Sequence, residues 1–238
     1  MTRHFGALIP STNTTCEIEY TRLLPPEYQA HYGRMMSSSP TKSPFSSPLD
    51  ADLDYQAKLL GTAKVEMVML VQTSASLHSP GYDADVTKRM AAASGVTAIT
   101  SATAITRAIK ALKAKRIALV SPYSVPVNEA AKSLFEGGAG CEVIAVEGFA
   151  ATDSYAIGAL GPENARDAFQ RINRPEIDAF IVPGGNFPTM GHVAGWEAEF
   201  KKPVVTTNQA LIWAMLRQFE AKEGLKGLGA LLEEVPAD

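Results

Sequence analysis

The strongest constraint on the fold is an alternation of short apolar runs with helical stretches along the chain. Residues 65–71 read V-E-M-V-M-L-V, and residues 116–120 read R-I-A-L-V. Runs this apolar are typical of strands that are buried on both faces, as in parallel sheets covered by helices. Because a helical stretch follows nearly every such run, the sequence predicts an α/β fold with mostly parallel sheets.

The predicted elements have a definite order. Strands are predicted at residues 4–9, 29–36, 65–71, 97–100, 116–120, 141–146, 179–182 and 203–206. Helices are predicted after Thr14 or Thr15, either of which can cap a turn containing Glu17, and at residues 53–62, 83–93, 102–113, 127–135, 162–172 and 209–220. The helix at 127–135 is expected to stop at Gly137-Gly138. Residues 37–48, S-S-S-P-T-K-S-P-F-S-S-P, are expected to form a loop.

Three stretches of the first half recur in the second half, in the same order. G-A-L-I-P-S at 6–11 resembles A-L-V-S-P-Y at 118–123, and V-M-L-V before Gln72 resembles A-F-I-V before Pro183. T-A-I-T-S-A-T-A-I at 97–105 resembles P-V-V-T-T-N-Q-A-L at 203–211. The common spacing of roughly 110 residues predicts two copies of one unit. We therefore expect two pseudo-symmetric lobes with parallel sheets and a cleft between them, at the carboxyl ends of the strands.

These lobes have an expected boundary. The N-terminal lobe is predicted to span residues 1–115 and the C-terminal lobe residues 116–238. Residues 207–225 are expected to pack back onto the N-terminal lobe.

Composition excludes several classes of protein. Among 238 residues, 22 Lys and Arg stand against 25 Asp and Glu, so the chain lacks the basic surplus of a nucleic-acid binder. Charge, Gly or Pro interrupts every apolar run too early for a membrane span, and we expect a soluble, cytoplasmic protein. Two cysteines and four scattered histidines give neither a disulfide framework nor a metal site. Because no phosphate-binding glycine motif occurs, we do not expect a bound nucleotide or NAD.

Four predicted loops would meet at the cleft, at residues 10–15, 72–76, 121–123 and 183–186. They are rich in hydroxyls, amides and glycine N–H groups and contain no Lys or Arg, which suits a carboxylate or a developing oxyanion. The predicted substrate-binding residues are Pro10, Ser11, Asn13, Asn186 and Asn208. The predicted catalytic residues are Gln72, Thr73, Ser74, Tyr123, Gly184, Gly185, His78 and His192.

The motifs in these loops also resemble a known group of enzymes. They are P-S-T-N-T-T at 10–15, Q-T-S-A-S at 72–76 with P-G-Y-D at 80–83, S-P-Y at 121–123 with V-N-E at 127–129, and T-T-N-Q-A at 206–210. In this order they resemble maleate cis-trans isomerases and arylmalonate decarboxylases of the aspartate/glutamate racemase superfamily. The resemblance covers nearly the whole chain and is weakest at residues 37–48.

The resemblance implies an enzyme without a cofactor, commonly a homodimer, that grips a small carboxylate. Asn13, Thr73, Ser74 and Tyr123 match the gripping positions of the family. The chain departs from the family at its cysteines, which end the central strand of each lobe. The first position corresponds to Gln72, and the second to Pro183, or to Gly184 if the gap is placed one residue later.

This departure limits the chemistry. Neither an amide nor a proline or glycine side chain can act as a base or nucleophile near neutral pH, which argues against racemisation by two bases and against a thiol adduct. Cys16 at a helix start, where the dipole lowers a thiol pKa, is one substitute, although a buried packing role is favoured. His78 and His192 are the others.

Three functions remain open on the sequence. The first is an isomerase or decarboxylase that acts on a small mono- or dicarboxylic acid through oxyanion or enolate stabilisation. The second is a hydrolase or hydratase in which Gln72 positions a water and the N–H groups of Gly184 and Gly185 help hold the oxyanion. The third is a carboxylate-binding protein without catalysis.

Overall fold

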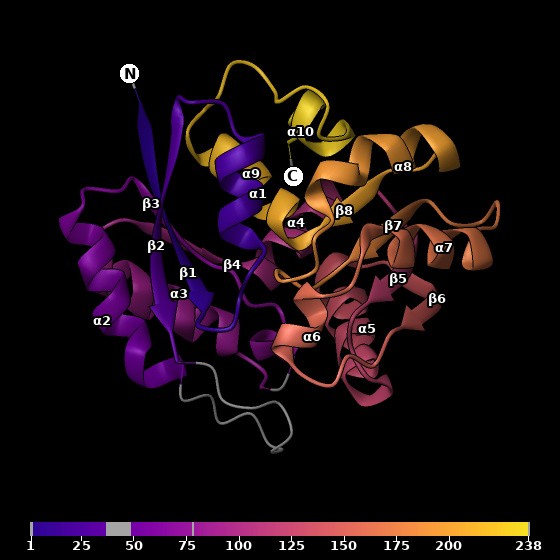
Figure 1. The fold of residues 1–238 in the computed structure, drawn as a ribbon, viewed down its shortest axis with the longest axis horizontal. Coiled ribbons are helices and arrows are strands. Elements are labelled where there is room, and N and C mark those ends of the chain that lie inside the picture. Colours follow the sequence, from indigo (N-terminus) through magenta and orange to yellow (C-terminus); the bar gives the residue numbers. More distant parts are fainter. Residues whose placement is uncertain (1, 37–48, 78, 238) are drawn as a thin grey trace.

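Two four-stranded parallel sheets form the framework of the chain (Figure 1). The first has the strand order β2–β1–β3–β4 and consists of β1 (Arg3–Pro10), β2 (Tyr28–Met35), β3 (Met67–Leu70) and β4 (Thr97–Thr100). The second has the order β6–β5–β7–β8 and consists of β5 (Arg116–Ser121), β6 (Glu142–Gly148), β7 (Ala179–Val182) and β8 (Val204–Thr206). The computed structural model describes residues 2–36, 49–77 and 79–237.

The two sheets have the same connectivity, which confirms the predicted pair of related lobes. The three recurring stretches fall on equivalent strands: β1 matches β5, β3 matches β7 and β4 matches β8. In both lobes the last strand runs directly into a helix, α4 (Ser101–Ala111) or α9 (Thr207–Gln218). The two helices begin alike, because Thr100 Oγ1 accepts from Thr103 N and Thr206 Oγ1 accepts from Gln209 N.

The remaining helices cover the faces of the sheets. They are α1 (Cys16–Leu23), α2 (Leu49–Thr62), α3 (Tyr82–Ser94), α5 (Val125–Ala139), α6 (Ser154–Gly158), α7 (Pro162–Ile172), α8 (Val193–Phe200) and α10 (Ala230–Glu234), with short 3₁₀ helices η1 (Ser74–Leu77) and η2 (Met190–His192). None of the described helices is long and apolar enough to cross a bilayer. The predicted loop at 37–48 lies outside the described residues.

Two local predictions are wrong for identifiable reasons. Helix α5 continues through Gly137 and Gly138 and ends only where Gly140 takes a left-handed conformation, with φ 66°. Both inner glycines keep helical geometry because the helix packs on its other face, through Ala131 and Phe135. The sequence elements predicted above also omit α6, α8 and α10. Helices α6 and α10 have only five residues each, and α8 is framed by no clear turn signal.

A single apolar core joins the lobes. It includes Ile9 and Met69 from the first sheet, Ile117 and Ile181 from the second, and the fully buried Trp213 of α9. Helix α9 packs against α4, so the end of the chain contacts the first lobe. One smaller cluster fills the outer side of each lobe. Because the inner core is shared, the cleft between the lobes has a fixed shape. The boundary at residues 115 and 116 stays a prediction.

Two helical glycines give opposite predictions for stability. A methyl group at Gly61 of α2 would lie 2.3 Å from the backbone oxygen of Ser94 at the end of α3, whereas one at the exposed Gly137 of α5 meets nothing within 4 Å. We expect Gly61→Ala to destabilise the protein by about 1–3 kcal/mol through overpacking. Gly137→Ala is expected to stabilise it by about 0.5–1 kcal/mol, since alanine favours the helix.

Urea unfolding of both variants and the wild type measures these effects. Equal effects of the same sign at the two positions would contradict the packing of α2 on α3.

Candidate active site

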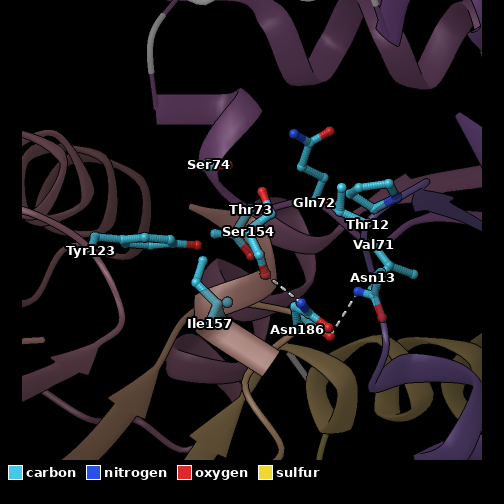
Figure 2. Close-up of a pocket in the computed structure, with 13 residues that line it drawn as sticks. Thr12, Asn13, Val71, Gln72, Thr73, Ser74, Tyr123, Ser154, Ile157 and Asn186 are labelled. Atoms are coloured by element: carbon cyan, nitrogen blue, oxygen red, sulfur yellow. Dashed lines mark hydrogen bonds between the residues drawn. The ribbon is translucent and has the colours of Figure 1, made fainter. Parts of the chain in front are cut away.

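The four predicted loops converge on one pocket at the carboxyl ends of the strands, where the two lobes meet (Figure 2). Its empty volume is about 380 Å³ and is partly open to solvent. The residues that line it are Pro10, Thr12, Asn13, Val71, Gln72, Thr73, Ser74, Tyr123, Ser154, Ile157, Gly184, Gly185 and Asn186.

Nine of the predicted site residues line this pocket, three described ones do not, and one lies outside the described residues. Ser11 is exposed, and Asn208 lies buried behind Gly185, to whose carbonyl oxygen it donates. His192 is exposed on η2, where its ring stacks on Trp196 at a centroid distance of 5.8 Å. His78 lies outside the described residues.

Four lining residues were not predicted. Thr12 and Val71 flank predicted residues in the same loops, so finer reading of those loops could have included them. Ser154 and Ile157 belong to α6, whose first turn Asp153 caps by accepting from Ala156 N at 2.8 Å. The Asp-Ser pair is a usable capping signal for α6. Nothing in the sequence tells that this helix covers the pocket.

A chain of hydroxyls connects the two lobes beneath the pocket. Thr73 Oγ1 lies 3.1 Å from Ser101 Oγ and 3.1 Å from Thr207 Oγ1. Thr207 Oγ1 in turn accepts from the backbone N–H of Gly184 at 2.8 Å. That N–H is therefore engaged within the protein, which corrects the expectation that it is free to hold an oxyanion.

Gly184 is also constrained as a backbone position. Its φ of 120° lies in a region that L side chains rarely adopt, and a Cβ there would lie 2.9 Å from Pro122 Cγ. The loop therefore requires glycine at this position.

Two buried asparagines build the pocket wall. Asn13 Nδ2 donates to Gly185 O at 3.1 Å, and Asn13 Oδ1 accepts from the backbone N–H groups of Thr15 and Cys16 at 3.0 and 2.9 Å. Asn13 thus supplies the cap at the start of α1, where Thr15 holds the cap position but makes no capping bond with its side chain. Because only one Nδ2 hydrogen remains free, Asn13 can give a ligand at most one hydrogen bond.

Asn186 joins three segments. Its Oδ1 accepts from Thr14 N at 2.7 Å, its backbone oxygen accepts from Thr15 Oγ1 at 2.8 Å, and its Nδ2 donates to Ser154 O at 2.6 Å (Figure 2). The first lobe, the second lobe and α6 are thereby held together at the pocket. Asn186 is mainly a structural residue of the site.

Tyr123 presents its hydroxyl toward Thr73 from the opposite side of the pocket (Figure 2). Ser121 Oγ accepts from Tyr123 N at 3.1 Å, and Asn128 Nδ2 donates to Tyr123 O at 3.2 Å, so the backbone is fixed. Burial raises the pKa of Tyr123 well above its usual range, and its side-chain hydrogen bond with Thr73 only partly opposes the rise. The phenol is therefore a neutral hydrogen-bond donor at physiological pH.

Two polar atoms at the pocket are buried without a partner, Gln72 Oε1 and Thr12 Oγ1. Buried polar atoms in folded proteins are nearly always hydrogen-bonded to protein, water or ligand. Figure 2 shows the Gln72 amide extending from the end of β3 away from the Tyr123 hydroxyl. The pocket therefore has a second polar side, opposite the hydroxyl donors.

The lining carries no charge and no thiol among the residues that the structure describes there. Cys16 is fully buried in α1, where burial and the carboxylate of Glu19 raise its thiol pKa, so the expected lowering by the helix dipole does not occur. Cys141 lies before β6, half-buried, with its sulfur 3.5 Å from Phe135 O. Neither residue lines the pocket.

A buried carboxyl lies behind the pocket. Glu19 of α1 accepts from Thr189 N and Met190 N at 2.8 Å each, and from Asn208 Nδ2 at 2.6 Å. Burial raises its pKa from 4.5 to about 7, although these three hydrogen bonds oppose the rise. In the sequence Glu19 looks like an ordinary acid in the first turn of an exposed helix, so it was not predicted as part of the site.

Comparison with known protein families identifies relatives of this chain. A family model described as arylmalonate decarboxylase matches residues 38–232. Among curated proteins, a maleate isomerase of Pseudomonas putida is 30% identical over 241 residues, covering 95% of this chain and 96% of the relative. A maleate isomerase of Nocardia farcinica is 25% identical and covers 98% of this chain and 96% of the relative.

Solved structures show the same architecture. A variant of the maleate isomerase Iso from Pseudomonas putida S16, crystallised with maleate, has a TM-score of 0.90 and 27% identity, with 98% of each chain covered. A Nocardia farcinica maleate cis-trans isomerase with a covalently bound succinylcysteine intermediate has a TM-score of 0.90 at 24% identity, covering 98% of this chain and 99% of that one. The latter likeness concerns the fold alone.

The shifted pKa of Glu19 predicts a pH-dependent stability. A carboxyl whose pKa is higher in the folded than in the unfolded protein stabilises the fold fully below about pH 4.5, and this contribution is lost as the pH rises through about 7. The loss is on the order of 3 kcal/mol. We expect the wild type to lose stability relative to Glu19→Gln over this range, measured by urea unfolding at several pH values. A difference between the two proteins that does not vary with pH would contradict this prediction.

Proposed function

This chain belongs to the arylmalonate decarboxylase family and is an enzyme of the isomerase or decarboxylase type, and from that premise we propose a specific reaction. The enzyme removes one carboxylate from a small acid of the malonate type, in which two carboxylates share one carbon. It does so without a catalytic thiol. The other carboxylate is held by uncharged donors.

One observation carries this proposal: the polar groups of the described lining are uncharged, and none of them titrates near neutral pH. Isomerisation through a thiol adduct needs a nucleophile, and hydration of an alkene needs a general base. Decarboxylation of a malonate needs neither for the bond-breaking step, because the electrons of the C–C bond pass to the remaining carboxylate. That step needs stabilisation of the resulting enediolate, which hydrogen-bond donors supply.

The Thr73 hydroxyl donates to Ser101 Oγ and so fixes the site from within. The donors left for a ligand are the hydroxyls of Ser74 and Tyr123, together with the backbone N–H groups of Ser74 and Gly185. No hydrogen-bond partner for these two N–H groups is found within the described part of the chain. As charge builds up on the carboxylate oxygens, fixed donors stabilise it more than mobile water does.

Apolar side chains can remove water from the carboxylate that departs. Pro10, Val71 and Ile157 also line the pocket. A carboxylate placed against such a surface loses hydration, whereas the carbon dioxide that leaves is uncharged and suits it. We assign the departing carboxylate to this apolar part of the lining.

The product carbon must then receive a proton. We assign it to a water molecule held by Gln72, whose buried Oε1 lacks a partner and can accept from water. The hydroxide that remains combines with the released carbon dioxide. In the overall reaction, one malonate dianion and one water give one carboxylate monoanion and one bicarbonate. No protein group changes its protonation state in this sequence.

The same water supports a second candidate. If the ligand is an unsaturated acid, a water held by Gln72 can add to it, which would make the enzyme a hydratase. The lining offers this water no base among the described residues, so decarboxylation is the better-supported reaction.

A panel of small acids tests the proposal. We expect phenylmalonate or methylmalonate to release carbon dioxide, and maleate to be unchanged. Tyr123→Phe and Ser74→Ala are each expected to lower kcat roughly 10²–10³-fold, the usual cost of losing one oxyanion donor. Tyr55→Phe and Ser133→Ala, at exposed positions on α2 and α5, serve as matched controls. Iodoacetamide should leave the rate unchanged. No turnover of any malonate, with calorimetric binding retained, would favour a binding protein instead.

Isotopes identify the source of the proton. In D₂O the product acid is expected to carry one deuterium at the former malonate carbon, at equal rates in the wild type and in His78→Gln. In ¹⁸O-water the organic product should carry no label, whereas a hydratase would place ¹⁸O in it. Loss of turnover in His78→Gln would move the proton source to that histidine and contradict the role given to Gln72.

A further inference from the structure

Glu19 connects three segments that meet only at the pocket. It is carried by α1 of the first lobe, and its Oε1 accepts from the two successive N–H groups that open η2 of the second lobe, Thr189 N and Met190 N. Its Oε2 accepts from Asn208 Nδ2, in the first turn of α9. The side chain is almost fully buried, with 7% of its surface exposed.

The contact with Asn208 continues to the pocket lining. Asn208 Nδ2 also donates to Gly185 O at 3.1 Å, beside Asn13 Nδ2 at the same distance. Since Nδ2 has two hydrogens, one serves Glu19 and the other serves Gly185. The carboxylate therefore fixes the amide that fixes a lining peptide.

Stability alone gives no reason for a carboxyl at this position. Burying an ionisable group costs free energy, and a neutral side chain of similar size commonly stabilises such a site. The raised pKa of Glu19 is the sign of that cost. Glu19 is separated from the lining residue Gly185 only by Asn208, and this position points to a role in the site.

We propose that Glu19 is a positioning residue whose ionised form holds the loop of residues 184–186 in its pocket-lining geometry, so that the site is assembled when Glu19 is charged and loosened when it is protonated. The inference concerns the protein alone and holds for whichever acid is the substrate.

The hydrogen bonds of the structure favour the ionised form. All three partners of Glu19 are donors, so a proton on Oε2 would face the N–H of Asn208. This clash between two hydrogens is removed when the Asn208 amide rotates and brings its Oδ1 to Glu19. Asn208 Oδ1 is buried and has no partner in the ionised arrangement, so it is available for this exchange. The rotated amide would place an oxygen against Gly185 O, which weakens the hold on the loop.

Other titratable groups near Glu19 do not compete with it. On α1, burial raises the pKa values of Cys16 and Tyr20, so both stay neutral around pH 7. On η2, His192 is exposed and stacks on Trp196. In α9 the facing group is the amide of Asn208. Among the described residues, no charged side chain contributes to the shift of the Glu19 pKa.

Backbone amide shifts from NMR test the inference without a substrate. In the wild type, the amides of Thr189, Met190 and Gly185 are expected to titrate together between pH 5.5 and 8.5, with a midpoint near 7. In Glu19→Gln, which keeps the size of the side chain and stays neutral, all three should be independent of pH. The matched control is Glu197→Gln. Glu197 is a half-buried carboxyl of α8 that also accepts from two backbone N–H groups, Val204 N and Ala230 N, but does not contact the lining.

Enzyme kinetics give the second readout, with phenylmalonate as the probe. Wild-type kcat is expected to fall as the pH drops through about 7, and Glu19→Gln to show a kcat lowered tenfold to a hundredfold and flat in pH, as expected for a displaced donor. Glu197→Gln should keep the wild-type profile. If phenylmalonate is not turned over, the proposed function fails and the amide shifts still decide this inference.

Two results would overturn it. One is the absence of any titration at Thr189 and Met190, which would mean that Glu19 does not change charge in this range. The other is titration at those two amides with Gly185 unmoved, which would reduce Glu19 to a brace between the lobes.

Discussion

The carbonyl oxygen of Gly185 is the point on which the site depends. It accepts one hydrogen bond from Asn13 of the first lobe and one from Asn208 at the start of α9. Next to it, Gly184 donates to Thr207, which also meets Thr73 of the first lobe. A short stretch of glycine backbone thus takes its position from both copies of the repeated unit. The close approach requires small residues, because a Cβ at Gly185 would lie 2.7 Å from Val71 Cγ1.

The absence of charge in the described lining gives the pocket its chemical character. A fixed cation would bind any small anion tightly in the ground state, whereas neutral dipoles gain most when charge shifts onto the oxygens they face. The resemblance predicts an anion grip at Thr73, Ser74 and Tyr123, and all three residues line the pocket. Gln72 and Gly184, at positions where the resemblance leads one to expect sulfur, line it as well.

The two related lobes and the buried strands could be predicted from the sequence. Strand runs such as residues 97–100 and 179–182 were placed at their observed bounds, because buried parallel strands have an unmistakable composition. The loops that line the pocket follow from strand ends alone. Three features escaped prediction for physical reasons. Ser154 and Ile157 lie on a helix of five residues, too short to show a period. Glu19 acts through tertiary contacts that no local pattern records, and the same contacts hold Asn208, which was predicted to bind substrate, behind the lining. Helix α5 passes two glycines because packing on its other face outweighs their weak propensity.

The core shared by the two lobes has a consequence for how molecules enter. Lobes that had separate cores could rotate apart, but α4 and α9 pack side by side within one apolar interior, so hinge opening would expose it to water (Figure 1). Helix α6 contributes nothing to that interior and has no buried residue. Among the described residues, Ser154 and Ile157 of α6 are therefore positions where the pocket lining can change while that interior stays intact.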